Sequence, residues 1–196
     1  RSYSVTGVQT CALPILVLLV QDALPAADSF LEALTAPFAA DPRLAGCYGR
    51  QRPRPGANPI LAERLRHWNA SRGEPVIQEA SEAELARLAP LERLHRCAFD
   101  NVASAVRRSA WEAAPFGRRA FGEDLAWARR VLLAGHRIRF EPAAEVIHSH
   151  DRSPMAEFRR LYCDHQNLRE LFGLRSEDHT SELQSPTTIS YSFFCL

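Results

Sequence analysis

One uninterrupted apolar run constrains the fold of this chain more than any other stretch. Residues 16–20 read Leu-Val-Leu-Leu-Val, and a polar turn with Asp22 and Pro25 follows them. Five consecutive apolar residues predict a strand that is covered on both faces, as in a parallel sheet flanked by helices. The run is far shorter than the roughly 20 residues that a membrane helix needs. We therefore expect an α/β fold.

Asp22 is the first candidate functional residue, because it directly follows this strand. In open α/β sheets, ligands bind beyond the carboxyl ends of the strands. The carboxylate is thus expected where a ligand would lie. The alternative is a purely structural residue in a turn or at a helix cap ahead of the next element.

A second stretch, residues 121–130, joins a glycine and two adjacent carboxylates to a helical pattern. Its apolar residues recur at three- and four-residue spacings, so they share one helix face. Glu123 and Asp124 fall in the first turn, where the helix dipole favours negative charge. Helix-start acids are the simplest interpretation. A carboxylate beside a glycine hinge also suits a catalytic base.

The rest of the chain alternates between helical and extended patterns. We expect helices at 26–39, 60–68, 81–88, 109–113, 123–134 and 154–172, and strands at 44–48, 99–108, 136–140 and 144–147. Ser81 and Glu84 have the spacing of a capping box, and Gly135 suits a helix C-cap. The last helix is expected to bury an apolar side that includes Phe158 and Tyr162.

Charge and cysteine content exclude several classes of protein. The 24 basic residues are all arginine and oppose 23 acids, so no strong field for nucleic acid or a membrane surface is implied. Cys47, Cys97 and Cys163 lack CxxC spacing, so neither zinc nor a disulfide framework is expected. A reducing, cytoplasmic setting fits these thiols.

The two ends of the chain do not look like parts of a domain. Residues 5–15 and 175–185 resemble translations of a common sequencing-adapter oligonucleotide, read on opposite strands. We therefore expect residues 1–15 and 175–196 to be extraneous and the tail to be disordered. Residues 16–174 are expected to be the domain, cut at both ends from a longer gene.

Several motifs follow one another in an order that resembles a known family. They are Gln-Asp-Ala-x-Pro from residue 21, Tyr-Gly-Arg-Gln-x-Pro from residue 48, Asn101 with the segment 104–108, Glu123-Asp124 with Trp127, His148-Ser149-His150, and Phe-Arg-Arg from residue 158. Together they resemble the family 2 inverting glycosyltransferases with the GT-A fold, in particular the rhamnosyltransferase-like branch. The likeness covers residues 16–174.

The resemblance implies transfer of a sugar, with inversion, from a nucleoside diphosphate to a hydroxyl of a saccharide or a lipid-linked saccharide. By likeness, Asp124 is the catalytic base and Glu123 a supporting acid. Asp22, His148 and His150 are the implied ligands of a divalent metal, Mg or Mn. Val20 replaces the first acid of the family's Asp-x-Asp motif. For the two histidines, a solvent-facing or hydrogen-bonded pair at a strand end is the alternative.

Six further residues are implied to contact substrate, namely Arg50, Gln51, Asn101, Arg107, Arg108 and Trp127. Residues 50–59 are expected to form a proline-rich loop whose Arg50, Arg52 and Arg54 could contact phosphate or sugar. For these arginines, simple exposure to solvent is the alternative. In this fold the nucleoside binds the amino-terminal strands, which precede the Asp-x-Asp strand. The chain is therefore expected to be a partial GT-A fold that lacks the nucleotide pocket and is inactive alone. Loss of the strands that would flank residues 16–20 is expected to leave apolar surface and a naked sheet edge there. The intact protein is expected to make cell-envelope polysaccharide at the inner face of the membrane, with peripheral attachment.

Two other functions would use the same residues. One is a non-catalytic carbohydrate-binding or scaffold protein of this fold, and the other is a metal-dependent hydrolase that uses Asp22, Asp124 and the two histidines. Nucleic-acid binding is not expected, because acids balance the arginines and no aromatic residues interleave with them. The glycosyltransferase hypothesis requires that Asp22 and Asp124 face one cleft, with the two histidines nearby.

Overall fold

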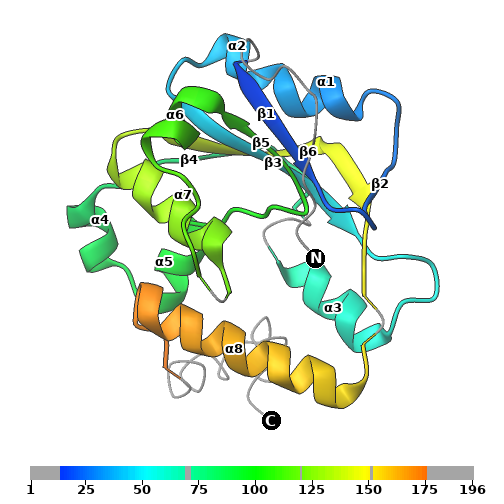
Figure 1. Cartoon of the computed structure of the whole chain (residues 1–196). Helices are drawn as coiled ribbons and strands as arrows, with labels where there is room; N and C mark the ends of the chain where they lie inside the picture. Colours follow the sequence, from blue (N-terminus) through cyan, green and yellow to red (C-terminus); the bar gives the residue numbers. More distant parts are fainter. Residues whose placement is uncertain (1–13, 69–71, 120, 151, 176–196) are drawn as a thin grey trace.

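A mixed sheet with helices on both faces forms the body of the structure (Figure 1). The computed structural model describes residues 14–68, 72–119, 121–150 and 152–175, so the expected extraneous ends fall largely outside the described residues. The strands are β1 (Ile15–Leu19), β2 (Leu24–Pro25), β3 (Leu44–Arg52), β4 (Val76–Gln78), β5 (Ala103–Arg107) and β6 (Arg137–Ile147). The helices are α1 (Phe30–Thr35), α2 (Pro37–Ala40), α3 (Pro59–His67), α4 (Glu82–Arg87), α5 (Pro90–Arg96), α6 (Arg108–Ala113), α7 (Glu123–Leu133) and α8 (Pro154–Phe172). The predicted α/β class is confirmed.

The order of the strands brings several chain ends to one edge of the sheet. Within the described residues the order is β1-β5-β3-β6-β2, and β4 also pairs with β6. β5 runs antiparallel to both β1 and β3, whereas β3 and β6 are parallel. The carboxyl ends of β1, β3 and β6 therefore lie at the same edge as the start of β5. This edge holds the candidate site.

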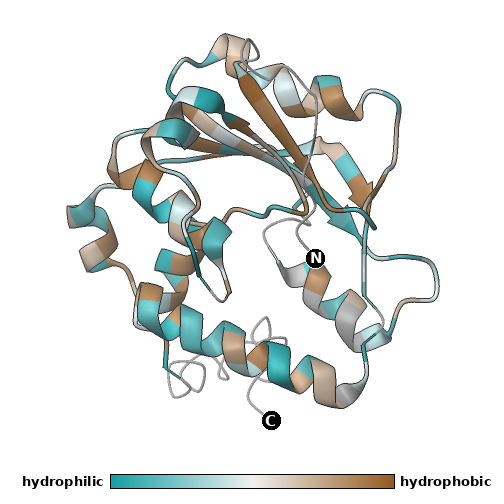
Figure 2. Ribbon diagram, in the orientation of Figure 1, coloured by the Kyte–Doolittle hydropathy of each residue, from teal (hydrophilic) through white to brown (hydrophobic). Residues whose placement is uncertain are grey.

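The parallel pairing predicted for the first strand was wrong, whereas the naked sheet edge expected beside it is present among the described residues. β1 pairs antiparallel with β5 and is the last strand on its side of the described sheet. Val17 and Leu19 are 41% and 43% exposed, so one face of the strand is open rather than covered. Figure 2 shows this apolar strand at the front of the molecule. Its composition matches a buried strand, but its neighbours among the described residues cover only one side.

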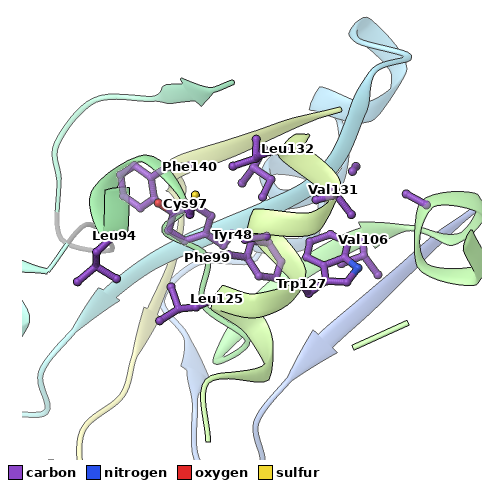
Figure 3. Packing of buried hydrophobic residues seen from close by; sticks show 14 of the residues in the cluster. Tyr48, Leu94, Cys97, Phe99, Val106, Leu125, Trp127, Val131, Leu132 and Phe140 are labelled. Carbon is purple, nitrogen blue, oxygen red and sulfur yellow. The ribbon is translucent and has the colours of Figure 1, made fainter. Parts of the chain in front are cut away.

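Two hydrophobic clusters fill the two faces of the sheet. On one face, Phe30, Leu34 and Phe38 of α1 and α2 pack with small residues of the central strands. On the other, an aromatic group packs against α4–α8, and Figure 3 shows it from close by. In this group the ring centroids of Phe99 and Trp127 are 4.9 Å apart. The helices are thus anchored on both faces, which fixes the edge of the sheet between them.

β6 is one continuous strand, although two short strands were predicted in its place. Gly49 pairs with Glu141 and the next residue, Arg50, pairs with Glu145, so β6 accommodates residues 142–144 as a bulge. Residues 138 and 140 pack on one side of the sheet, and 144 and 146 pack on the other. The bulge therefore transfers the buried side of β6 from one hydrophobic cluster to the other.

Other boundaries differ from the prediction for local reasons. Pro37 divides the expected helix 26–39 into α1 and α2, since proline lacks an amide hydrogen. β3 continues to Arg52, so residues 50–52 are strand rather than loop. β4 and α5 were not predicted, and Ile15, expected to lie outside the domain, is part of β1.

The helix ends follow the sequence closely. Ser81 accepts a hydrogen bond from the Glu84 amide, and the Glu84 carboxylate accepts one from the Ser81 amide, which confirms the capping box. α8 spans the predicted residues, yet Phe158 and Tyr162 are 56% and 59% exposed, so its predicted apolar side was partly wrong. Among the described helices, none combines the length and apolarity that a membrane span requires.

Gly49 provides a test of the bulge in β6. A Cβ atom at this position would lie 2.1 Å from the Ala144 carbonyl oxygen, a backbone atom that cannot move aside alone. We predict that Gly49→Ala lowers the free energy of unfolding by about 2 kcal/mol or more, as overpacking does elsewhere. Urea unfolding measures the change. Gly73→Ala is the matched control, because its Cβ would meet nothing within 4 Å. Equal stability of the two variants would contradict the close approach.

Candidate active site

One cavity lies at the sheet edge where the strand ends gather. Its volume is about 470 Å³, and it is lined from β3 by Gln51, from the start of β5 by Asp100 and Asn101, and from α7 by Glu123 and Asp124. The segment after β6 contributes His148, Ser149 and His150. Arg152, just before α8, and Arg160, Asp164, His165 and Leu168 of α8 line the opposite side. The cavity therefore combines carboxylates, imidazoles and guanidinium groups.

Asp22, His148 and His150 form a compact group of potential metal ligands at this cavity. The Asp22 carboxylate lies 3.5 Å from His148 Nε2 and 3.2 Å from His150 Nδ1. One ligand atom from each of the three residues lies within 4.8 Å of the others. Asp22 follows β1, while His148 continues the β3–β6 pairing through a 2.8 Å bond from its amide to the Arg52 carbonyl oxygen. The parallel directions of β1 and β6 bring the three side chains together.

The hydrogen bonds of His148 leave one ring nitrogen available. Its Nδ1 lies 2.9 Å from Gln51 Oε1, whereas the buried Nε2 has no hydrogen-bond partner among the described residues. Burial and the nearby His150 lower the pKa of His148, although Asp22 opposes this shift. Burial and Arg152 likewise lower the pKa of His150. Neutral imidazoles are the form that binds metal, so these three side chains fit a divalent ion.

The acid pair opens α7, as predicted. Gly122 has φ +66° at the N-cap, and a Cβ there would lie 2.0 Å from Asn167 Nδ2 of α8. Only glycine tolerates both this conformation and this contact. The Asp124 carboxylate accepts hydrogen bonds from the Leu125 amide at 2.8 Å and from the Asn101 amide at 3.4 Å. Glycine and α8 thus place Asp124 at the cavity.

The environment of Asp124 suits a base that works near neutral pH. Burial, followed by the negative charge of Asp100, raises the pKa of Asp124 to about 7. Two backbone hydrogen bonds oppose this shift. A general base is most effective when its pKa lies near the working pH. His148 and His150 line the same cavity as Asp124, and the Asp22 carboxylate lies beside both histidines, although Asp22 is not itself among the lining residues.

Asp100 is a residue of this site that the sequence reasoning missed. It accepts hydrogen bonds from Trp68 Nε1 at 3.1 Å, from the Val102 amide at 2.9 Å and from the Gln51 side-chain amide. Burial raises the pKa of Asp100, although the hydrogen bonds from Val102 and Trp68 oppose the shift. The available signal was an acid directly before a strand of small residues. It could not be interpreted without the antiparallel direction of β5, which brings the start of this strand to the site.

Two predicted substrate contacts lie at the far end of β5. The Arg107 guanidinium donates to the carbonyl oxygens of Leu44 and Phe38, both at 2.9 Å. Arg108 forms an ion pair with Glu112 at 2.8 Å. Neither arginine lines the cavity, because the strand carries both away from the edge where it begins. Their observed role is structural.

Trp127 and Arg50 are also outside the cavity. Trp127 is fully buried, and its ring packs on Phe99 and Phe116 in the core. Arg50 lies in β3 rather than in a loop, and its Nε is 3.6 Å from the Glu145 carboxylate. Of the six predicted substrate contacts, only Gln51 and Asn101 line the cavity. Two arginines that were not predicted, Arg152 and Arg160, line the cavity instead. Both form ion pairs with Glu157, at 3.6 and 3.7 Å.

Comparisons with known proteins agree with the family resemblance. The chain is 31% identical over 156 residues to the O-antigen chain rhamnosyltransferase RfbN of Salmonella typhimurium, covering 79% of this chain and 47% of that protein. It is 33% identical over 148 residues to the O-antigen chain rhamnosyltransferase WbaN of Salmonella anatum, covering 74% and 44%. The chain thus spans about half the length of the curated relatives it matches. The resemblance to the rhamnosyltransferase-like group is confirmed.

A solved structure also matches the chain, at a lower identity than these relatives. A mannosyltransferase, PcManGT from Pyrobaculum calidifontis in complex with GDP-Man and Mn²⁺, superimposes with a TM-score of 0.49 at 17% identity. The match covers 92% of this chain and 45% of that structure. No family model matches the chain.

The raised pKa of Asp124 predicts an effect on stability. In the unfolded chain this carboxyl ionises near its ordinary value of 3.8, whereas in the folded protein it ionises near pH 7. The folded state therefore loses stability as the pH rises from about 4 to 7 and remains destabilised above it. We predict that Asp124→Asn raises the free energy of unfolding at pH 8 by about 2–4 kcal/mol, with little change at pH 4.

Urea unfolding at the two pH values tests this prediction. Glu123→Gln is the matched control, because it removes a neighbouring charge from the helix end, where the dipole favours that charge. This control is expected to be no more stable than the unsubstituted chain at pH 8. A similar increase in the free energy of unfolding in both variants would show that repulsion among the acids, rather than burial of Asp124, causes the instability at pH 8.

Proposed function

Because the chain is related to the rhamnosyltransferase-like glycosyltransferases, we propose that its protein transfers a sugar from a nucleoside diphosphate to a hydroxyl of a growing polysaccharide. Transfer proceeds with inversion at the anomeric carbon, and rhamnose is the expected sugar. One observation carries this proposal: Asp124 lines the same cavity as two members of the Asp22, His148 and His150 group. A base and a site for the leaving diphosphate are thereby close enough to serve one reaction.

Asp124 takes the proton of the acceptor hydroxyl. Its oxygens are held by the amides of Asn101 and Leu125, so the carboxylate keeps one orientation in the cavity. A pKa near 7 leaves it ionised for part of the time at neutral pH and basic enough to accept a proton. Glu123 lines the cavity beside it and keeps the local potential negative. Loss of the hydroxyl proton makes the acceptor oxygen nucleophilic as it attacks the anomeric carbon.

Asp22, His148 and His150 would hold a divalent cation, which would supply positive charge against the departing diphosphate. Two imidazoles in the set favour Mn²⁺ over Mg²⁺. Arg152, just before α8, and Arg160 of α8 line the cavity and offer further positive charge to the phosphates. The residues of the chain thus supply a base on one side of the reacting carbon and a cationic region on the other.

Residues 16–174 correspond in this proposal to the catalytic half of the protein. The remaining half of the relatives' length supplies the nucleoside pocket, so the chain alone is inactive as a transferase. The acceptor is a saccharide or a lipid-linked saccharide of the cell envelope. The reaction takes place in the cytoplasm, at the inner face of the membrane. Free thiols at Cys47, Cys97 and Cys163 suit a reducing compartment.

The role of Asp124 predicts the pH dependence of transfer by the full-length protein. Protonated Asp124 cannot accept a proton, so kcat/KM should fall about tenfold per pH unit below about pH 7 and reach a plateau above it. Asp124→Asn should lower the rate at least about 100-fold at pH 8. Radiolabelled sugar transfer to an extracted acceptor provides the measurement. Glu112→Gln, an acid that pairs with Arg108 outside the cavity, should retain activity. Full activity of Asp124→Asn would refute the assignment.

The metal group predicts binding of Mn²⁺. Removing one of three protein ligands should weaken Mn²⁺ binding by more than the roughly 10–100-fold typical of outer-shell changes. We expect this loss for Asp22→Asn and for His148→Ala, measured as bound Mn²⁺ by electron paramagnetic resonance. His136→Ala, just before the opposite end of β6, is the control and should bind normally. Equal binding by all variants would place the ion elsewhere.

A further inference from the structure

We propose that Gln51, itself oriented by Asp100, holds His148 in the tautomer whose Nε2 is free to bind a cation. Gln51 is thus a positioning residue that acts through His148, and Asp100 acts through Gln51. The inference rests on the proposed function, because it assumes that His148 is a metal ligand there. It begins from a chain of three side chains that join β5, β3 and the end of β6.

Asp100 is the fixed end of this chain. Three N–H groups point at its carboxylate, from the Gln51 side chain, the Trp68 indole at 3.1 Å and the Val102 amide at 2.9 Å. An ionised carboxylate only accepts hydrogen bonds, and all three of these groups can only donate. The three hydrogen bonds can therefore all form when Asp100 carries no proton. The NH₂ group of Gln51 must face this carboxylate.

The orientation of the Gln51 amide then determines the tautomer of His148. With its NH₂ group on Asp100, Gln51 presents Oε1 to His148 Nδ1 at 2.9 Å. A carbonyl oxygen only accepts, so Nδ1 must carry the hydrogen, and in the neutral ring Nε2 keeps a lone pair. Gln51 and His148 are both 6% exposed, so water has little access to exchange with this hydrogen bond. Three buried or half-buried groups thereby specify one proton position.

The free nitrogen points toward the other two ligands. His148 Nε2 is buried without a hydrogen-bond partner among the described residues, and the Asp22 carboxylate lies 3.5 Å away. A lone pair facing a carboxylate is unfavourable by itself, since neither group can donate. A cation between them satisfies both. If Gln51 had only a packing role in β3, replacing it would not change the position of the hydrogen on His148.

The experiment follows the proton and the metal separately in the full chain. In the first arm, ¹⁵N-labelled histidine and long-range ¹H–¹⁵N correlation spectra report the tautomer of His148 in metal-free protein, with His148→Ala identifying the signal. In the second arm, electron paramagnetic resonance measures Mn²⁺ binding. Gln51→Met removes the amide at similar volume. Gln78→Met is the matched control, because Gln78 is a buried glutamine outside the site, and its side-chain amide donates to the carbonyl oxygens of Arg96 and Ala98.

We expect the unsubstituted chain to carry the hydrogen on Nδ1. In Gln51→Met the hydrogen should move to Nε2, where Asp22 is the remaining acceptor, and Mn²⁺ affinity should fall about 10–100-fold. Asp100→Asn should change the tautomer and the Mn²⁺ affinity in the same direction but by less. The asparagine amide can donate as well as accept, so it no longer fixes the orientation of the Gln51 amide. Gln78→Met should change neither, even if it lowers stability.

Three results would overturn the inference. These are a hydrogen on Nε2 in the unsubstituted chain, an unchanged tautomer in Gln51→Met, and a shifted tautomer with unchanged Mn²⁺ affinity. Failure of the unsubstituted chain to bind Mn²⁺ counts against the proposed metal site instead. In that case the tautomer measurement still decides whether Gln51 sets the proton position.

Discussion

The site depends on the parallel pairing of β3 with β6. This pairing places Gln51 beside Val146 and continues past the strand, where the His148 amide binds the Arg52 carbonyl oxygen at 2.8 Å. The side chains of Gln51 and His148, which meet in the site, are therefore positioned by the backbone hydrogen bonds of β3 and β6. β5 lies on the other side of β3 and brings Asp100 to the same edge. Gln51 lies in a strand, and Asp22, Asp100, His148 and His150 lie within three residues of a strand end, so the sheet limits how far these polar groups can separate.

Local rules allowed much of the fold to be predicted. The bounds of α8, the N-terminal acids of α7 with Gly122, and the capping box of α4 all follow from contacts within a few residues. The metal group was predicted from a resemblance, and the structure does place its three members together. Which of these residues act in catalysis stays a prediction, because proximity alone does not establish a role.

Long-range pairing explains what the sequence did not reveal. The apolar run of β1 matches a strand of a parallel sheet, but only its pairing with β5 shows that it runs antiparallel to its neighbour. Asp100 and Arg107 stand at opposite ends of β5, so its direction determines which one reaches the cavity. Trp127 could have been placed correctly, because it lies four residues before Val131 on the buried side of α7. The family resemblance wrongly outweighed that periodicity.

The bulge at residues 142–144 has a consequence for how the protein can vary. Side chains of a strand alternate, so a shift of one residue reverses the side to which all later residues point. The bulge sets this phase for the last part of β6 and hence for His148 and His150. Loss or gain of a single residue there would turn both imidazoles away from Asp22 while leaving the amino acids themselves unchanged. Homologous chains that keep the histidines should therefore also keep the number of residues between Glu141 and His148.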